Sequence, residues 1–330
     1  MKVGTVGTNF IVDWFIEGAK KTGEIEIAAV YSRGKESAGA FAEKHGVKKI
    51  YTERRSFLED ANLDFIYVAS PNSLHYEWCR DALEAGRNVI CEKPFVSKTS
   101  ELEDLVRRAK EKNLFLFEAM SVSHLPNFAL IREKLPLLGK IRFVQLNFSQ
   151  YSSRYDAFLQ GKNPNTFNPE FSAGTLMDLN CYNLHFVLNL FGEPESLHYY
   201  ANKAENGIDT SGVLVMQYGD FIATAVAAKD SGGKSSVQIQ GENGYIVSES
   251  TSNNLKNGLS IVTKSGTEFI NNQDDENHLY SVARAFLACF RSGDISGCHK
   301  ALKLSLMAAR LLDMARKDAG IVFPADKLNY

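Results

Sequence analysis

The chain has 330 residues, a hydrophobic fraction of 44% and a formal net charge of −2. At roughly 150 residues per domain this length corresponds to about two domains, each with enough apolar residues for a core. No basic excess is present that could neutralise a row of phosphates, so nucleic acid is excluded as the expected partner and a small molecule is favoured.

The composition also bears on the compartment and on metal binding. The five cysteines are odd in number and show no C-x-x-C spacing, which is typical of reduced, packed thiols in a cytosol. The N-terminus enters a strand pattern at once, and no window approaches the ~18 apolar residues of a membrane span. The seven histidines are scattered. We therefore expect a cytoplasmic protein with no membrane partner and no metal site.

The first 120 residues alternate apolar strand patterns with helical patterns. Nearly all-apolar strands separated by helices predict a doubly wound α/β domain with a parallel sheet over residues 1–120. The strand patterns cover residues 2–7, 25–32, 64–70, 88–93 and 114–120, and the helical patterns cover 11–21, 35–46, 73–86 and 99–113.

Residues 121–330 have a different pattern, with consecutive alternating strands joined by Gly, Asn and Asp turns. This pattern predicts a second domain of α+β class built on an open, mostly antiparallel sheet. Two helices are expected near the end of the chain, and either could pack back on the first domain. The expected strands are 141–151, 211–220, 221–229, 235–241, 244–250 and 259–266, and the expected helices are 276–291 and 297–318.

The stretch GTVGTNFIV, residues 4–12, partly matches the dinucleotide-binding fingerprint. Gly7 takes the first glycine position, but Asn9 and Val12 stand at the second and third. The turn follows the first strand and opens a helix, so the amides of Thr8, Asn9, Phe10 and Ile11 could face a pyrophosphate at the positive helix end. The alternative is a plain strand-to-helix turn.

The end of the second strand bears on the choice of cofactor. Binders of NAD usually offer an acidic residue there, whereas an arginine can accept the 2′-phosphate of NADP. This strand ends in Ser32 and Arg33, which both donate hydrogen bonds. NADP is therefore favoured, with NAD kept open, and the alternative is that Arg33 is an ordinary surface cation.

Two further loops follow strands of the predicted sheet. Ser70 and Asn72 lie at the carboxyl edge of the third strand, with His75 in the next helix, where doubly wound folds bind ligands. Alternatively, Asn72 caps that helix and His75 packs in the core. After the next strand, Glu92 and Lys93 place two charges where a buried apolar run ends, which indicates a functional role.

These motifs are followed by FEA at residues 117–119 and AGTLMDLNCY at 173–182. In this order, and over essentially its whole length, the chain resembles the Gfo/Idh/MocA oxidoreductase family. The resemblance implies that residues 1–120 form an NAD(P)-binding Rossmann domain and that the second domain is built on an open antiparallel sheet. It also implies an NAD(P)-dependent dehydrogenase or reductase with Glu92 and Lys93 at the nicotinamide site and a Lys93–Pro94 bond that is often cis. It also implies a homodimer, or a dimer of dimers, formed through the C-terminal sheet.

The catalytic partner of Lys93 is expected at Tyr182. If residues 173–182 are helical, Asp178 and Tyr182 lie on one face. This pair is similar to that of the branch containing dimeric dihydrodiol dehydrogenase and NADP-dependent D-xylose dehydrogenase. Tyr182 would then be the proton acceptor, Lys93 would stabilise the phenolate or alkoxide, and Asp178 would orient the substrate or Lys93. The alternative is a core tyrosine bonded to Asp178.

The resemblance implies a small sugar, polyol or cyclic diol as substrate, and a non-sugar substrate stays open. A rival function is a non-catalytic NAD(P)-sensing regulator of the same fold. Two departures weaken the transfer of site residues. Ser121 and Ser123 stand where the branch usually has an aromatic residue and an arginine, and Asn9 replaces a fingerprint glycine. Arg154 could supply a missing contact.

Overall fold

The computed structural model describes residues 1–273 and 275–328. They form two compact units. The first comprises residues 1–119 and 277–306, and the second comprises residues 120–276 and the described residues from 307 onward. Helix α10 (Ile295–Asp318) begins in the first unit and ends in the second.

The first unit contains a six-stranded parallel sheet in the order β3-β2-β1-β4-β5-β6. This is the strand order of the dinucleotide-binding doubly wound fold, and it confirms the predicted fold class. The strands are β1 (Lys2–Val6), β2 (Glu26–Tyr31), β3 (Lys49–Tyr51), β4 (Phe65–Val68), β5 (Asn88–Cys91) and β6 (Leu116–Glu118). The helices are α1 (Phe10–Lys21), α2 (Lys35–His45), α3 (Arg54–Leu58), α4 (His75–Glu84), α5 (Thr99–Glu111) and α9 (His278–Ser292), with the 3₁₀ turn η1 (Asn72–Leu74).

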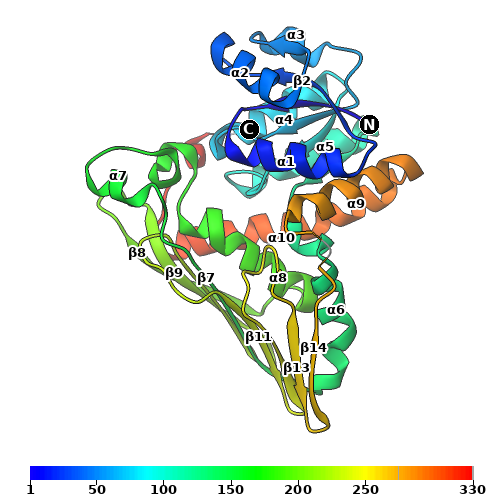
Figure 1. The fold of residues 1–330 in the computed structure, drawn as a ribbon. Helices are drawn as coiled ribbons and strands as arrows, with labels where there is room; N and C mark the ends of the chain where they lie inside the picture. Colours follow the sequence, from blue (N-terminus) through cyan, green and yellow to red (C-terminus); the bar gives the residue numbers. More distant parts are fainter. Residues whose placement is uncertain (274, 329–330) are drawn as a thin grey trace. The chain divides into compact units, whose positions relative to one another are not determined.

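Helix α9 comes from the C-terminal part of the chain but packs alongside α1 (Figure 1). Gly18 makes this approach close, because a Cβ atom there would lie 2.8 Å from the backbone nitrogen of Tyr280. Under α1, the rings of Phe15 and Tyr67 stack at 3.8 Å between centroids, and both are fully buried. The apolar faces of α1 and α9 thus share one core with the sheet.

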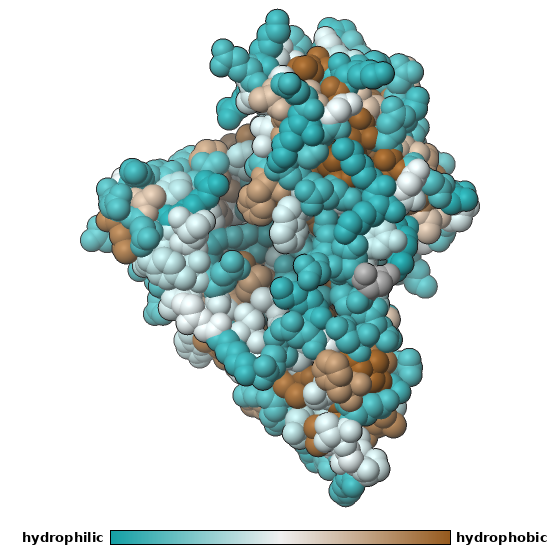
Figure 2. Space-filling model, in the orientation of Figure 1, coloured by the Kyte–Doolittle hydropathy of each residue, from teal (hydrophilic) through white to brown (hydrophobic). Residues whose placement is uncertain are grey.

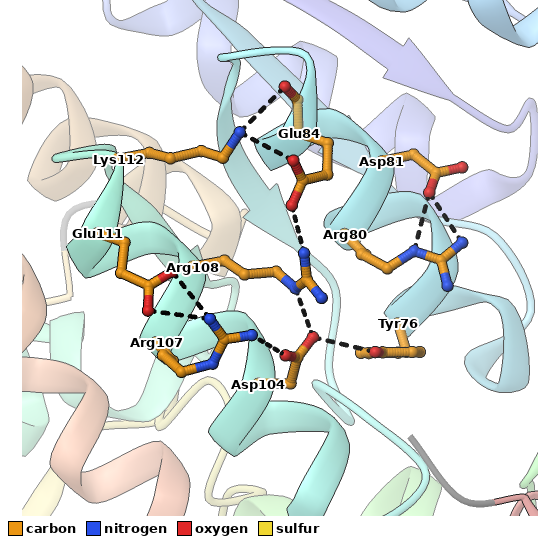
Figure 3. Close-up of polar contacts among 9 residues, drawn as sticks. All are labelled: Tyr76, Arg80, Asp81, Glu84, Asp104, Arg107, Arg108, Glu111 and Lys112. Carbon is orange, nitrogen blue, oxygen red and sulfur yellow. Dashed lines mark hydrogen bonds and ion pairs between the residues drawn. The ribbon is translucent and has the colours of Figure 1, made fainter.

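Charged residues join α4 and α5 on the surface of the first unit (Figure 3). Arg108 of α5 forms ion pairs with Asp104 on its own helix and with Glu84 on α4, and Lys112 reaches Glu84 at 2.9 Å. The hydroxyl of Tyr76 donates to Asp104 at 3.0 Å. Exposed pairs contribute little individually, so the network chiefly fixes how the two helices align.

The second unit contains an eight-stranded mixed sheet in the order β14-β13-β12-β11-β7-β10-β9-β8. All neighbouring pairs are antiparallel except β7 with β10, which confirms the mostly antiparallel prediction. The strands are β7 (Ile141–Ser149), β8 (Ser196–Lys203), β9 (Asp209–Gln217), β10 (Ile222–Ala228), β11 (Ser236–Gly241), β12 (Gly244–Ser248), β13 (Leu259–Thr263) and β14 (Gly266–Ile270).

The helical segments of this unit are short. They are α6 (Pro126–Lys134), α7 (Tyr155–Leu159), α8 (Cys181–Phe191), the π-helical turn η6 (Leu176–Asn180) and the 3₁₀ turns η2 (Ser121–His124), η3 (Leu135–Leu138), η4 (Asn165–Phe167), η5 (Pro169–Phe171) and η7 (Pro324–Lys327). Two buried side-chain amides connect η6 and α8 to the sheet. Asn180 Nδ2 donates to the Ala225 carbonyl at 2.9 Å, and Asn183 Nδ2 donates to the Val226 carbonyl at 3.2 Å.

The face of this sheet opposite η6 and α8 is only partly buried. Val213 and Val226 are half-buried while their chain neighbours are buried, and Tyr200 is 68% exposed. In the view of Figure 2, hydrophilic residues cover most of the surface and apolar residues gather in small separate patches. Adjacent apolar residues on an exposed sheet face are typical of a protein–protein interface.

Candidate functional site

The turn after β1 is built around Gly7 and Asn9. Gly7 has φ +104°, and a Cβ atom there would lie 2.8 Å from the Ala69 carbonyl oxygen, so only glycine fits. Asn9 has an ordinary extended backbone (φ −86°, ψ 172°) and needs no glycine. Its side-chain Nδ2 donates to the Ala69 carbonyl at 3.0 Å, so the side chain also links this turn to the end of β4.

Asn9 also caps helix α1, and this cap involves one of the amides predicted to contact a pyrophosphate. Its Oδ1 accepts hydrogen bonds from the amides of Ile11 at 3.1 Å and Val12 at 3.4 Å. The Ile11 amide is therefore engaged within the protein. The backbone amides of Thr8, Asn9 and Phe10 donate no hydrogen bond within residues 1–273 and 275–328, and they remain the predicted pyrophosphate donors at the N-terminus of α1.

Ser32 and Arg33 directly follow β2, at the carboxyl edge of the sheet. The Ser32 hydroxyl lies 2.9 Å from the hydroxyl of Ser37, and its amide donates to the Tyr51 carbonyl at 3.2 Å. Arg33 is exposed and forms no ion pair in the described part of the chain. This strand end therefore presents a cation and no carboxylate, and binding of a 2′-phosphate there stays a prediction.

His75 is the first residue of α4, and it joins two strand-end loops. It is buried, with Nδ1 2.9 Å from the Pro94 carbonyl oxygen and Nε2 2.9 Å from the Ser70 carbonyl oxygen. Burial lowers the pKa of His75 to about 4, and the Lys93 charge acts in the same direction against the carbonyl contacts. A neutral imidazole donates through one of these nitrogens. The structure thus favours the packing alternative for His75.

Asn72 does not cap α4 as the alternative proposed. It opens the turn η1, and α4 begins three residues later behind Leu74, which makes no side-chain cap bond. The Ser70 hydroxyl lies 3.4 Å from the Pro71 carbonyl oxygen. Both residues remain at the carboxyl edge of β4, and their contact with a cofactor stays a prediction.

Glu92 and Lys93 follow β5 directly. The Glu92 amide continues the sheet by donating to the Val68 carbonyl at 2.9 Å, and its carboxyl is buried, accepting the Tyr67 hydroxyl at 2.6 Å. Burial raises the pKa of Glu92 to about 7, against the opposing effects of Tyr67 and Lys93. The Lys93–Pro94 bond is cis, as the resemblance implied. Glu92 therefore has a place in the core, and its role toward the cofactor stays a prediction.

In the second unit, Asp209 fixes the start of the segment that carries Asp178 and Tyr182. Its buried Oδ2 accepts the Leu176 amide at 2.6 Å and the Tyr199 hydroxyl at 2.7 Å. Gly174 has φ +100°, and a side chain there would overlap the Asp209 carboxylate. The Asp209 carboxylate therefore fixes the backbone at the start of this segment.

This segment is not the regular α-helix that the spacing argument assumed. Over residues 176–180 it makes a π turn, in which the Cys181 amide donates to the Leu176 carbonyl five residues earlier, and α8 starts only at Cys181. Asp178 and Tyr182 were expected on one face only if the segment had α-helical spacing, and the π turn does not have that spacing. Single π turns are frequent at functional sites.

Asp178 and Tyr182 have different surroundings. Tyr182 is buried at 5% exposure, with its ring 6.1 Å from that of Phe148. Asp178 forms an ion pair with Lys229, the residue directly after β10. Sequence reasoning passed over Lys229, although it carries the same signal as Lys93, a lysine placed directly after a buried apolar strand.

The departures noted in the sequence have structural roles in the second unit. The Ser121 hydroxyl is buried and donates to the Asn253 carbonyl at 2.7 Å, and the Ser123 hydroxyl accepts from Asn189 at 2.6 Å. Arg154 is exposed just before α7, and its amide donates to the Ser152 hydroxyl at 3.2 Å. A substrate contact by Arg154 stays a prediction.

Clusters of metal ligands, membrane-spanning helices and disulfides are absent from the described residues. Within residues 1–273 and 275–328, no cluster of three or more His, Cys, Asp or Glu side chains could hold a metal ion. None of the helices in that part of the chain has the length and apolar character needed to span a membrane. All five cysteines are free thiols, and four of them are buried.

Comparison with known proteins agrees with this architecture. A family model described as "Oxidoreductase family, NAD-binding Rossmann fold" matches residues 1–120, and one described as "GFO/IDH/MocA C-terminal domain" matches residues 135–247. The chain is 39% identical to the uncharacterized oxidoreductase YgjR of Escherichia coli (strain K12). It is 34% identical to the scyllo-inositol 2-dehydrogenase (NADP(+)) IolU of Bacillus subtilis (strain 168). Both matches cover 99% of each protein.

Among solved structures, the chain is similar to KijD10, a 3-ketoreductase from Actinomadura kijaniata in complex with NADP and TDP-benzene. The TM-score is 0.84 at 21% identity, over 96% of this chain and 97% of that chain, so the likeness concerns the fold. Fold and matches together define an NAD(P)-dependent oxidoreductase with a Rossmann unit. The chain belongs to the Gfo/Idh/MocA family and is a dehydrogenase of that family, which confirms the predicted enzyme class.

Proposed function

We propose that this protein is an NADP-dependent dehydrogenase or reductase that acts on a secondary alcohol, hemiacetal or carbonyl of a small polyol, sugar or cyclic diol. The observation that carries the proposal is the segment 174–182. There a buried tyrosine follows a π turn that bears an ion-paired aspartate, and buried Asp209 fixes the start of the turn. Such a supported arrangement is what a positioned proton acceptor requires.

In the oxidative direction, Tyr182 would take the proton of the substrate hydroxyl, and Lys93 would stabilise the phenolate or the developing alkoxide. Asp178 would accept a hydrogen bond from the substrate. A bound nicotinamide would supply the hydride acceptor. With tyrosine in place of histidine as the proton acceptor, we place the protein near the dihydrodiol and D-xylose dehydrogenase branch.

The preference for NADP rests on the end of β2. Arg33 is exposed there without an ion-pair partner in the described chain, and no carboxylate at the strand end would repel a 2′-phosphate. The three amides at the start of α1 would hold the pyrophosphate. The 34% identical relative IolU is an NADP(+) scyllo-inositol 2-dehydrogenase by name, which agrees with this preference.

The substrate class is proposed from the relatives and is tested by assay. IolU is named a scyllo-inositol 2-dehydrogenase, so cyclic polyols are the first compounds to try. Initial rates would be measured with scyllo-inositol, myo-inositol, D-xylose and a trans-dihydrodiol, each with NADP⁺ and NAD⁺. We expect turnover of at least one compound, faster at low cofactor concentration with NADP⁺.

The control for this assay is Lys93→Ala, which should abolish turnover while cofactor affinity stays within about tenfold, because the lysine acts on the proton transfer. A variant with near-normal kcat would contradict the assignment of Lys93. An unfolded variant would instead show that Lys93 is structural. Wild-type protein that binds NADPH but turns over none of the compounds would place the substrate outside this class.

We also propose that the protein forms a homodimer, or a dimer of dimers, through the half-buried face of the eight-stranded sheet. Val213, Val226 and Tyr200 give this face an apolar stripe on adjacent strands β8, β9 and β10. Burying such a surface against a second copy is favourable. Light scattering with size-exclusion chromatography would give the oligomeric mass directly.

A further inference from the structure

Lys229 is a buried lysine that the proposed reaction does not yet use. It follows β10 directly, its amide donates to the Thr210 carbonyl at 2.8 Å, and it is 5% exposed. Lysine is almost never fully buried unless its charge is paired, because removing an ammonium from water is costly. A lysine in this place therefore points to a specific task for its charge.

Three groups surround the ammonium. Lys229 Nζ forms an ion pair with Asp178, donates to the Thr166 hydroxyl at 2.6 Å, and lies 5.7 Å from the centre of the Phe167 ring. Phe167 is fully buried, so it shields the ammonium from water and offers the negative face of its ring. In a shielded place of this kind, an ion pair is stronger than on the surface.

The pair is asymmetric in exposure. The Lys229 side chain is 6% exposed, whereas the Asp178 side chain is 35% exposed. The cation thus holds the carboxylate from the protein side, and the carboxylate stands toward solvent on the π turn four residues before Tyr182. A carboxylate held in this way keeps one orientation and stays an acceptor.

We propose that Lys229 is a positioning residue that holds the Asp178 carboxylate in the orientation needed to accept a hydrogen bond from the substrate hydroxyl. This proposal rests on the proposed function of Asp178. It also gives Lys229 and Lys93 different roles. Lys229 serves Asp178 within the second unit, and the charge of Lys93 is left for the proton transfer at Tyr182.

Four variants test the proposal with the best compound of the substrate panel and NADP⁺. Lys229→Met keeps the apolar stem and removes the charge, and Lys229→Arg keeps the charge. Asp178→Asn and the double variant Lys229→Met/Asp178→Asn complete a cycle. Lys234→Met is the matched control, because Lys234 forms an exposed ion pair with Glu249 in the same unit. Its rate should stay within about twofold of wild type.

We expect Lys229→Met to lower kcat/KM by roughly 10- to 100-fold, with the Kd of NADPH within about threefold, because only substrate orientation is affected. Lys229→Arg should recover part of that loss. The double variant should be no slower than Asp178→Asn alone, because Lys229 acts through Asp178. It also removes both charges together, so it serves as the folded comparison if Lys229→Met does not fold.

Two results would overturn the role of Lys229. One is a folded Lys229→Met protein with kcat/KM within about twofold of wild type. The other is a double variant whose loss equals the product of the two single losses, or, if Lys229→Met does not fold, a double variant clearly slower than Asp178→Asn. Failure of the underlying function looks different, since Asp178→Asn itself would then keep wild-type kcat/KM.

Discussion

Replacing Glu92 by glutamine should stabilise the protein at alkaline pH. The Glu92 carboxyl is 5% exposed and accepts the Tyr67 hydroxyl at 2.6 Å, and burial raises its pKa to about 7 from an ordinary 4.5. Glu92→Gln keeps the size and the acceptor oxygen while it removes the charge. The variant therefore separates the cost of burying a carboxylate from the packing of the side chain.

The size of the effect follows from the two pKa values. Between pH 4.5 and about 7 the folded wild-type protein binds more protons at Glu92 than the unfolded chain, so its stability falls as pH rises through this window and is level above it. At about 1.4 kcal/mol for each pKa unit, the loss reaches about 3 kcal/mol at pH 8 and stays below about 1 kcal/mol at pH 5. Glutamine loses nothing over this range.

Urea unfolding of wild type and Glu92→Gln at pH 5, 6, 7 and 8 would measure the difference in the free energy of unfolding at each pH. Burial also lowers the pKa of His75, His124 and His278 to about 4, so each of them reduces stability as pH falls below 6.5. Both proteins share these histidines, and the difference removes their contribution.

We expect the advantage of the glutamine variant to grow from pH 5 to pH 8 by roughly 2 to 3 kcal/mol. Glu111→Gln on the exposed side of α5 is the control, with no such growth. A constant difference across the pH range, or a variant less stable than wild type at pH 8, would refute the argument that Glu92 is a buried carboxyl with a raised pKa.

Three further predictions concern other parts of the molecule. Arg33→Ala should weaken NADPH binding by about 1.5 to 3 kcal/mol and leave NADH binding unchanged, as measured by fluorescence titration. Equal weakening of both would contradict the proposed contact between Arg33 and the 2′-phosphate. Val226→Arg should convert the oligomer into monomers in light scattering, whereas an unchanged mass would move the interface off this sheet face. His75→Phe should lower the free energy of unfolding by about 1 to 3 kcal/mol because one of the two carbonyls of Ser70 and Pro94 loses its hydrogen-bond donor. A stability equal to wild type in urea would show that this hydrogen bond does not stabilise the protein.

The sequence allowed the parallel and antiparallel sheets to be predicted because their core strands are long, apolar or regularly alternating. Strands β3 and β14 were missed since β3 has three residues and β14 is mostly exposed, so neither shows an apolar run. Strand β8 was missed although its exposure alternates along Ser196–Tyr200, because the polar residues of SLHYYANK hide the pattern in the sequence. Local patterns therefore identified the core of each sheet better than its edges.

The candidate site was predictable where one residue type has one physical use. Gly7 is required by its positive φ and by the nearby Ala69 carbonyl oxygen. The π turn was not predictable, because the hydrogen bond from Cys181 to Leu176 depends on how Asp209 and the sheet hold the segment. The pairing of Asp178 with Lys229 depends in the same way on tertiary contacts 51 residues apart.

The most direct test of the central claim is the pH dependence of kcat in wild type and Tyr182→Phe on the best substrate with NADP⁺. Phenylalanine keeps the buried ring and removes only the hydroxyl, so stability should change little. The wild-type rate should rise with pH through an apparent pKa well below the ~10 of free tyrosine, a value that belongs to the coupled Lys93 and Tyr182 pair. Tyr182→Phe should lose ~10² to 10⁴ in kcat with NADP affinity nearly unchanged, and a Tyr182→Phe protein with wild-type turnover and the same pH profile would contradict the assignment of Tyr182 as proton acceptor.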